Sequence, residues 1–398
     1  MKRITTLLIA AAMIALPTMA KPKLWSEQQK KTKTIRNGEL WRDDGGRHIN
    51  AHGGGILKYN DTYYWFGEHK DEKTSDALVG VMCYASKDLV NWRNCGVALR
   101  VTEPAAGQGN GRNARRRGAT TDSDIERGCI LERPKVIYNP VTKKFCMWFH
   151  LELKGQGYSA ARYGVAVADR PEGPYKFLYS SRANAGTWPV EFKAQDIATA
   201  DTLNEANFKE WWTPTWRRAV NQGLILKRDF GTGQMARDMT LFIDDDGKAY
   251  HIFSSEENLT LHIAELTADY LHHTGRYTRM APGGQNEAPA IFKHDGTYWM
   301  ITSGCTGWAP NEARMFSAPS IWGPWTQHPN PCRGPKAEIT FGGQSTFVLP
   351  LNSQLIFMAD IWRPDHPIDA RYIWLPIEFE DGKPVVRWRD EWELKIEK

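Results

Sequence analysis

Five polar residues stand at equivalent places in five stretches of the sequence. In each stretch the polar residue is followed, four and five positions later, by two apolar residues, then by a turn and an aromatic run; these leading residues are His52, Glu132, Asp238, Glu287 and Gln344. If the three carboxyl groups gather in one place, they could act as general acid and base. Crowding and burial would raise the pKa of at least one of them into the range of a proton donor.

Short strands must position these residues. Helical periodicity is scarce, whereas β-branched and aromatic runs alternate with Gly, Asn, Asp and Pro turns, which is typical of an all-β chain. The five stretches begin "HGGGILKY", "ERPKVIYN", "DMTLFIDD", "EAPAIFKH" and "QSTFVLPL"; each forms one hairpin pattern and is followed by a second. Two hairpins supply four strands, so the repeat predicts a five-bladed β-propeller.

The first strand of each propeller blade lines the central axis. A residue just ahead of that strand lies at the same rim in every blade, so we expect the leading residues to converge on one pocket. Inverting hydrolysis of a glycosidic bond needs a carboxylic acid and a base about 6.5–9.5 Å apart, a separation that different blades can set. Each acid taken singly could equally be a structural hydrogen-bond acceptor. Five polar residues in the same register favour a shared functional site over five separate structural roles.

At these residues the sequence resembles glycoside hydrolase family 43. The segment "NEAPAIFKHDGTYWMITSG" is similar to the family's fourth-blade segment that bears the general acid, which maps to Glu287. The segment "RDMTLFIDDDGKAYHIF" is similar to the third-blade segment whose carboxylate, here Asp238, tunes the acid and orients the substrate. Most of the family has an aspartate base in an Asp-Pro motif of blade one. This chain has "NAHGGG" there instead.

Further motifs resemble one subfamily, the exo-β-1,3-galactanases (subfamily 24). They are "AHGGGI", "WFGEHK", "ERPKVIYN", "SGCTGWAPN" and "RYIW", and the likeness covers nearly the whole chain after residue 20 apart from two insertions. It implies that Gln344 acts on the attacking water, as an amide or as its imidic-acid tautomer, and that Glu132 binds the sugar and helps proton transfer. An ordinary amide is a very poor base, so this role of Gln344 comes from the resemblance alone.

Other substrate-binding residues are predicted from their positions beside these motifs. Glu68 is expected to bind a sugar hydroxyl, such as the axial 4-OH of galactose, and Trp308 to form a platform for a sugar ring. A structural role is an even alternative for each, and for Arg363 a buried ion pair is favoured. The predicted set is His52, Glu68, Tyr158, Thr306, Trp308, Asn311 and Arg363.

Two insertions interrupt the repeat, at about 101–128 and 182–235. The first holds Arg112 and Arg115 to Arg117 among glycines, a pattern typical of a solvated loop. The second holds four tryptophans and forms either a wall beside the site or a helical decoration on the outside. Aromatic residues make up 12% of the chain, an abundance that fits both cross-strand packing in a β-rich core and platforms for sugar rings.

The first twenty residues have the features of a secretory signal peptide. Lys2 and Arg3 precede an apolar run, and Thr18-Met19-Ala20 supplies a small-x-small cleavage site. We therefore expect residues 21–398 to form a single catalytic domain that is secreted or periplasmic and monomeric. The net charge of +5 implies no nucleic-acid partner, and no later segment is apolar enough to span a membrane.

The six cysteines permit disulfides in an exported protein. Cys83 and Cys95 flank one hairpin and could pair across it. No cysteine–histidine spacing resembles a metal site, and we expect neither a metal nor a cofactor.

The resemblance favours an inverting, exo-acting hydrolase that releases galactose from a β-1,3-galactan, such as the main chain of an arabinogalactan. Two alternatives remain open. The same fold could act as an α-L-arabinofuranosidase, a β-xylosidase or a β-galactofuranosidase, because pocket shape sets that choice. A non-catalytic glycan-binding propeller is the other alternative, since the usual base is missing. The presence of both Glu287 and Asp238 argues against it, because a pure binder needs no tuned acid.

Overall fold

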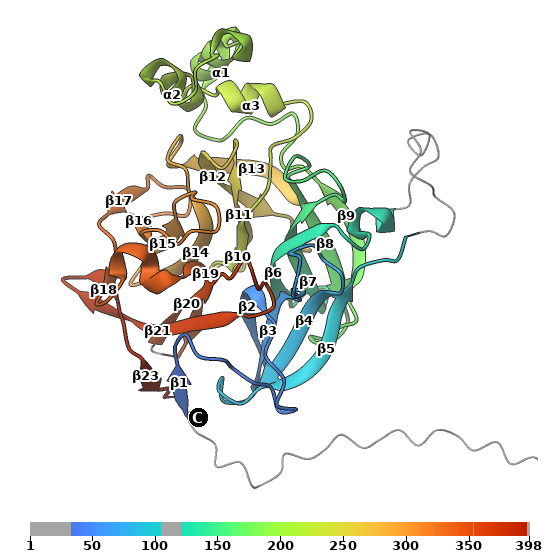
Figure 1. The fold of residues 1–398 in the computed structure, drawn as a ribbon. Coiled ribbons are helices and arrows are strands. Elements are labelled where there is room, and N and C mark those ends of the chain that lie inside the picture. Colours follow the sequence, from blue (N-terminus) through green and yellow to red (C-terminus); the bar gives the residue numbers. More distant parts are fainter. Residues whose placement is uncertain (1–32, 105–120, 353, 396–398) are drawn as a thin grey trace, which may run out of the picture. The chain divides into compact units, whose positions relative to one another are not determined.

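Five sheets of mainly antiparallel strands form the body of the described structure, as the repeat predicts. The computed structural model describes residues 33–104, 121–352 and 354–395, so the predicted signal peptide and the arginine cluster at 112–117 lie outside the described residues. In Figure 1 the sheets surround a common centre, with β2, β6, β10, β14 and β19 innermost. Each of these strands contacts the next around the ring, and β19 returns to β2. The fold is therefore a five-bladed β-propeller, and the predicted fold class is confirmed.

The strands of each blade run in chain order from the centre outward. Blade one contains β2 (His52–Tyr59), β3 (Thr62–Glu68), β4 (Gly80–Ser86) and β5 (Arg93–Arg100), and blade two contains β6 (Ile130–Asn139), β7 (Lys144–Glu152), β8 (Arg162–Ala168) and β9 (Lys176–Ser181). Blade three contains β10 (Met239–Ile243), β11 (Ala249–Ser255), β12 (Thr260–Leu266) and β13 (His273–Met280). Blade four contains β14 (Glu287–His294), β15 (Thr297–Ser303), β16 (Arg314–Ala318) and β17 (Thr326–His328). Blade five contains β19 (Gln344–Leu351), β20 (Gln354–Ile361), β21 (Arg371–Glu380) and β22 (Lys383–Arg387), with β18 (Cys332–Arg333) parallel to β22 at its edge.

The ring closes where the last blade meets the first. The Tyr372 hydroxyl on β21 donates to the Ile49 carbonyl oxygen and accepts from the Ala51 N–H, both at 2.9 Å. Trp65 of blade one packs against Trp374 of blade five with ring centroids 5.1 Å apart. A two-stranded sheet of β1 (Thr34–Arg36) and β23 (Glu391–Glu393) joins the two ends of the described chain.

A β-bulge interrupts the inner strand of four blades near its start. The pairing register shifts after His52, Glu132, Glu287 and Ser345. In three of these blades the residue directly after the leading residue has a positive φ: 59° at Gly53, 56° at Arg133 and 52° at Ala288. A bulge of this kind re-aims the neighbouring side chains, so it changes the direction of the side chains around these leading residues.

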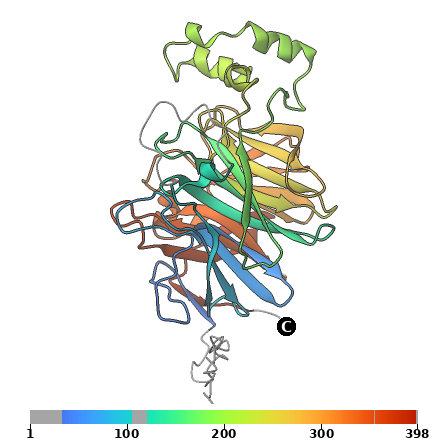
Figure 2. The same cartoon turned by 90° about the vertical axis from the view of Figure 1, so that its right-hand side faces the viewer.

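The second insertion forms a small helical unit. It contains α1 (Ala194–Thr202), η3 (Glu205–Asn207), α2 (Pro214–Asn221) and α3 (Leu224–Asp229). Elsewhere in the described residues, η2 (Thr121–Ile125) and η4 (Ala337–Gly342) are 3₁₀ helices. Figures 1 and 2 both place α1, α2 and α3 beyond the outer strands of blade three. The structure thus favours the predicted outer decoration over a wall beside the site. No helix of the described chain is long and apolar enough to cross a membrane.

The predicted pairing of Cys83 with Cys95 is not formed. All six cysteines are free thiols in the structure. Cys83 pairs with Gly96 across β4 and β5, and a register shift follows at this point. Cys83 is fully buried in a cluster between blades one and two, with Cys95 packed against it as a partly buried neighbour. In this structure both thiols therefore contribute as small apolar side chains.

Candidate active site

One cavity of about 270 Å³ gathers the leading residues of four blades. Seven predicted site residues line it: Glu68, Glu132, Tyr158, Asp238, Glu287, Trp308 and Gln344. Six residues that were not predicted complete the lining: Arg133, His150, Arg237, Asn258, Gly307 and Trp362. The expectation that the column converges on one pocket is therefore met by Glu132, Asp238, Glu287 and Gln344.

Glu287 has the environment of a proton donor. It is the first residue of β14, and its Oε1 accepts a 2.7 Å hydrogen bond from Asn258 Nδ2. Burial and then the negative charge of Asp238 raise the pKa of Glu287 to about 7, against an opposing effect of Arg133. A carboxyl group with this pKa is protonated in a large fraction of molecules near neutral pH, as general acid catalysis requires.

Arg133 connects the carboxylates and the glutamine at the bottom of the cavity. Its guanidinium Nη2 lies 2.8 Å from Asp238 Oδ2 and also donates to Gln344 Oε1. Its Nη1 donates to the Ser345 carbonyl oxygen at 3.1 Å, and the guanidinium lies 5.3 Å from the ring centroid of Trp362. This buried cation holds Asp238 beside the acid as a paired carboxylate, which keeps a negative charge in the cavity.

Gln344 is held by three hydrogen bonds from its amide group. Its Oε1 accepts from Arg133 and, at 2.9 Å, from Trp362 Nε1, while its Nε2 donates to Ser303 Oγ at 2.8 Å. Two N–H donors on the oxygen favour the amide, because the imidic-acid tautomer carries a proton on that oxygen. One amide hydrogen remains to point at a water or a substrate hydroxyl. The geometry therefore suits orienting a water better than deprotonating it.

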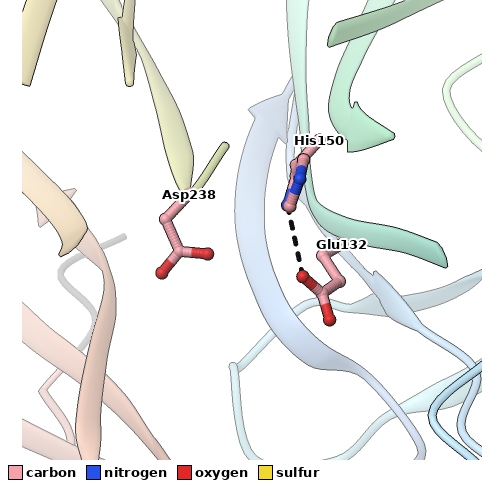
Figure 3. A group of neighbouring side chains, drawn as sticks. All are labelled: Glu132, His150 and Asp238. Atoms are coloured by element: carbon pink, nitrogen blue, oxygen red, sulfur yellow. Dashed lines mark ion pairs between the residues drawn. The ribbon is translucent and has the colours of Figure 1, made fainter. Parts of the chain in front are cut away.

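Glu132 and His150 form an ion pair opposite Asp238, as Figure 3 shows. His150 Nδ1 lies 3.2 Å from Glu132 Oε2, and Nε2 lies 2.9 Å from Glu152 Oε1. Burial disfavours the charged ring, but the two carboxylates outweigh it and raise the pKa of His150 to about 9. Burial likewise opposes ionisation of Glu132, yet His150 and Lys70 bring the pKa of that carboxyl to about 2. Both groups are therefore charged at neutral pH.

Ligand atoms of Glu132, His150 and Asp238 lie within 4.8 Å of one another, close enough to hold a metal ion. A doubly protonated imidazole has no lone pair for a metal, and the two carboxylates that flank His150 hold it in that form. Asp238 is already paired with the Arg133 guanidinium. The donor set is therefore better described as a network of ion pairs.

Comparison with known proteins identifies the family. The model of glycosyl hydrolases family 43 matches residues 210–382. A solved β-1,3-galactosidase of family 43, in a structure with galactodeoxynojirimycin, is 55% identical; the match covers 90% of this chain and 100% of that one, with a TM-score of 0.85. The chain belongs to glycoside hydrolase family 43.

Two further family members are similar over most of this family 43 chain. The exo-β-1,3-galactanase of Phanerochaete chrysosporium, solved with galactose, is 34% identical over 91% of this chain and 69% of that one, with a TM-score of 0.69. The exo-β-1,3-galactanase of Clostridium thermocellum is 32% identical over 91% of this chain and 67% of that one, with a TM-score of 0.69. No match was found among curated proteins.

Four predicted substrate-binding residues do not line the cavity of this family 43 protein. His52 is fully buried and stacks on Trp362, with ring centroids 5.0 Å apart, so it supports that ring from behind. Asn311 donates to Thr306 Oγ1 at 2.7 Å and to the Gly304 carbonyl oxygen at 3.0 Å, so both side chains brace the loop that carries Trp308. Arg363 forms an ion pair with Asp369 at 2.8 Å, but the pair is partly exposed and not buried as favoured from the sequence.

Glu68, Tyr158 and Trp308 do line the cavity as predicted. Tyr158 donates to Glu132 Oε1 at 2.9 Å. The two Glu68 carboxylate oxygens are engaged within the protein, by Lys70 Nζ at 2.6 Å and by the Arg133 N–H at 2.8 Å. Trp308 is 43% exposed at the mouth.

Two of the unpredicted residues lie directly beside motifs that the sequence singles out. Arg133 follows Glu132 directly, in the same "ERPK" motif, and Trp362 precedes Arg363 in "DIWRP". His150 and Asn258 come from β7 and from the turn after β11. Nothing in their local sequence marks them, because only the closed ring brings these elements to one pocket.

Proposed function

We propose that the protein is an exo-acting, inverting hydrolase that releases galactose from the end of a β-1,3-galactan. The observation that carries the proposal is the pairing of Glu287, a carboxyl group with its pKa raised to about 7, with the Asp238–Arg133 ion pair in one cavity. Its relatives support the substrate. One is a β-1,3-galactosidase, and a variant of the Phanerochaete chrysosporium enzyme was solved with β-1,3-galactotriose.

In the proposed reaction Glu287 protonates the leaving glycosidic oxygen. Asp238 favours the protonated form of Glu287 through its like charge and stabilises the positive charge that develops on the sugar ring. The cavity of about 270 Å³ is lined below by buried side chains such as Glu68 and Arg133. A pocket closed in this way suits the terminal sugar of a chain, in keeping with exo action.

Gln344 orients the attacking water through its remaining amide hydrogen in this proposal. Glu132, which is ionised and shares the cavity, accepts the proton late in the reaction. Its low pKa makes it a weak base. A weak base suffices because the water becomes strongly acidic once its oxygen bonds to an oxocarbenium-like carbon.

The test is to incubate the protein with β-1,3-galactobiose and, separately, with an aryl α-L-arabinofuranoside, and to follow the products by NMR. We expect galactose from the disaccharide, with the α-anomer appearing first, and no comparable release of arabinose. Faster release of arabinose would favour the arabinofuranosidase alternative, and binding without turnover would favour the glycan-binding one.

Glu287→Gln is the control for the acid. We expect this variant to fold normally and to lose roughly three or more orders of magnitude in turnover of the disaccharide, in the upper range for general acid catalysis or beyond it. An aryl galactoside with a good leaving group should be affected far less, because its departure needs no proton. Near-wild-type turnover of the disaccharide would contradict the assignment.

The features of the first twenty residues support export of this enzyme. A polysaccharide substrate is met outside the cytoplasm, so export fits the proposed activity. Cell fractionation that found the protein only in the cytoplasm would contradict this part of the proposal.

A further inference from the structure

The turn that joins β11 to β12 in blade three has an unusual backbone. Its residues Glu256, Glu257 and Asn258 have φ values of 52°, 59° and 61°. Three consecutive non-glycine residues in the left-handed region are rare, and such conformations persist only where the surroundings hold them. Contacts from outside the turn must therefore stabilise this backbone conformation.

Asn258 is the residue of this turn that enters the active-site cavity. Its Nδ2 donates a 2.7 Å hydrogen bond to Glu287 Oε1, and its Oδ1 accepts from Arg237 Nη1 at 3.4 Å. Because Glu287 Oε1 accepts this hydrogen bond, the proton of the carboxylic acid is left to Oε2. The place of Asn258 thus favours Oε2 as the oxygen of the acid that donates to a substrate.

Glu256 ties the turn to helix α2 through Arg279. Glu256 is fully buried, and Arg279 Nη2 lies 2.7 Å from its Oε2. The same guanidinium donates to the Val220 and Asn221 carbonyl oxygens, both at 2.9 Å. These are carbonyls of the last turn of α2, and that of Val220 also accepts from the Gly223 N–H at 2.9 Å. One buried arginine therefore joins the turn and the insertion.

The two remaining residues of the turn also contact the insertion. Glu257 Oε1 pairs with Arg228 Nη2 on α3 at 2.9 Å. Leu259, fully buried, belongs to the apolar cluster of the insertion, together with Trp216, Val220 and Ile225. Every turn residue except Asn258 is thus anchored on the helical unit, while Asn258 faces the acid.

We propose that the insertion at 182–235 is a brace that holds the 256–259 turn in its left-handed form and thereby orients the catalytic acid Glu287 through Asn258. Arg228, Glu256, Glu257, Leu259 and Arg279 are positioning residues in this arrangement; none of them lines the cavity. The inference rests on the proposed role of Glu287 as general acid. In this arrangement the insertion contributes to catalysis without contacting the substrate.

The experiment compares variants that loosen separate anchors with a matched control. Arg228→Met removes the partner of Glu257 on α3, and Leu259→Ala empties part of the insertion's apolar cluster. Lys227→Met is the control, because Lys227 is the neighbouring cation on α3 and pairs with Asp201 inside the insertion. Each protein is assayed with β-1,3-galactobiose and with a dinitrophenyl β-galactoside, whose leaving group needs no acid.

We expect Arg228→Met and Leu259→Ala to lower kcat for the disaccharide by about tenfold or more, since misplacing a reacting group by about 1 Å can cost about a hundredfold. Turnover of the dinitrophenyl substrate should stay within about twofold, because only general acid catalysis is impaired. The basic limb of the pH–rate profile should move to higher pH, since a weakened N–H donor favours the ionised acid less. Lys227→Met should match the wild type in all three measurements.

Equal loss on both substrates would overturn the proposal, since it would indicate general damage to the fold. Behaviour like that of Lys227→Met would overturn it too. Arg228→Met keeps the test decisive if Leu259→Ala fails to fold, because Arg228 is partly exposed. The proposed substrate is tested separately with the wild type. If the wild type does not cleave the disaccharide, each variant is compared with the wild type on the unactivated glycoside that the wild type does cleave and on the dinitrophenyl substrate.

Discussion

The catalytic acid depends on single charges placed within a few ångströms. Burial raises the pKa of Glu287, Asp238 raises it further, and Arg133 opposes both. Because the acid must be protonated to act, kcat/KM of the wild type should fall above about pH 7. Asp238→Asn removes the like charge, which lowers the pKa of Glu287. The basic limb of the pH–rate profile should therefore move to lower pH. An unchanged profile with full activity would show that Asp238 is only structural.

We predict that Gln344 orients the attacking water and does not bind the sugar ring. Gln344→Ala should abolish hydrolysis while substrate still binds, because other blades supply the remaining lining of the cavity. Single-turnover hydrolysis and calorimetry on the variant check the two parts separately. Full activity would show that Glu132, and not Gln344, acts on the attacking water, and that Gln344 is an ordinary residue at a strand end.

Gln344→Glu distinguishes orienting a water from deprotonating it. The carboxylate would accept from Arg133 and Trp362 as the amide does, but it has no hydrogen left to donate. We therefore expect this variant to remain as defective as Gln344→Ala in single-turnover hydrolysis. Activity close to that of the wild type would show that the position acts as a base.

At the scale of the element, the bulge at the start of the inner strands aims the site. Gly53 has a φ of 59°, and a methyl group at this position would lie 2.2 Å from Glu68 Oε1. Gly53→Ala should therefore displace Glu68 and raise KM. It should also lower the free energy of unfolding, and by a larger amount than the backbone strain alone, since a non-glycine residue in the left-handed region costs about 1–3 kcal/mol. Urea unfolding and steady-state kinetics measure both effects.

Gly96→Ala is the matched control for this bulge. Gly96 also has a positive φ, of 89°, but no atom lies within 4 Å of the added methyl group. It should carry only the backbone cost, with KM unchanged. Equal behaviour of the two variants would show that the close approach of Gly53 to Glu68 has no role in aiming the site.

At the scale of the whole molecule, the site depends on closure of the ring between blades five and one. Tyr372→Phe removes a hydroxyl that joins the two blades and leaves the Ile49 carbonyl and the Ala51 N–H without this partner. Each buried polar group left unpaired costs about 1–3 kcal/mol, so urea unfolding should show a loss of this order or larger, with activity retained under native conditions. Tyr175→Phe is a comparison, because the Tyr175 hydroxyl makes its bond to Pro171 within blade two. A loss no larger than that of Tyr175→Phe would contradict the importance of closure.

Much of the fold and about half of the site could be predicted from the sequence. The blades follow from local patterns, namely the period-2 alternation of strands and the turn residues between them. The leading residues followed from the same register, and Glu132, Asp238, Glu287 and Gln344 do line one cavity. His52 shares the register, but its side chain is fully buried and stacks on Trp362 outside the cavity lining.

The sequence by itself determined the five repeats, their order and the column of polar residues, because each depends on neighbours within about twenty positions. Only the tertiary structure decided that Arg133 bridges Asp238 and Gln344, and that the turn bearing Asn258 is anchored on the helical insertion. These contacts join residues about a hundred or more positions apart in the first case, and different structural units in the second. The pKa of Glu287 and the donors on Gln344 are set by such contacts, and they exist only once the ring has closed.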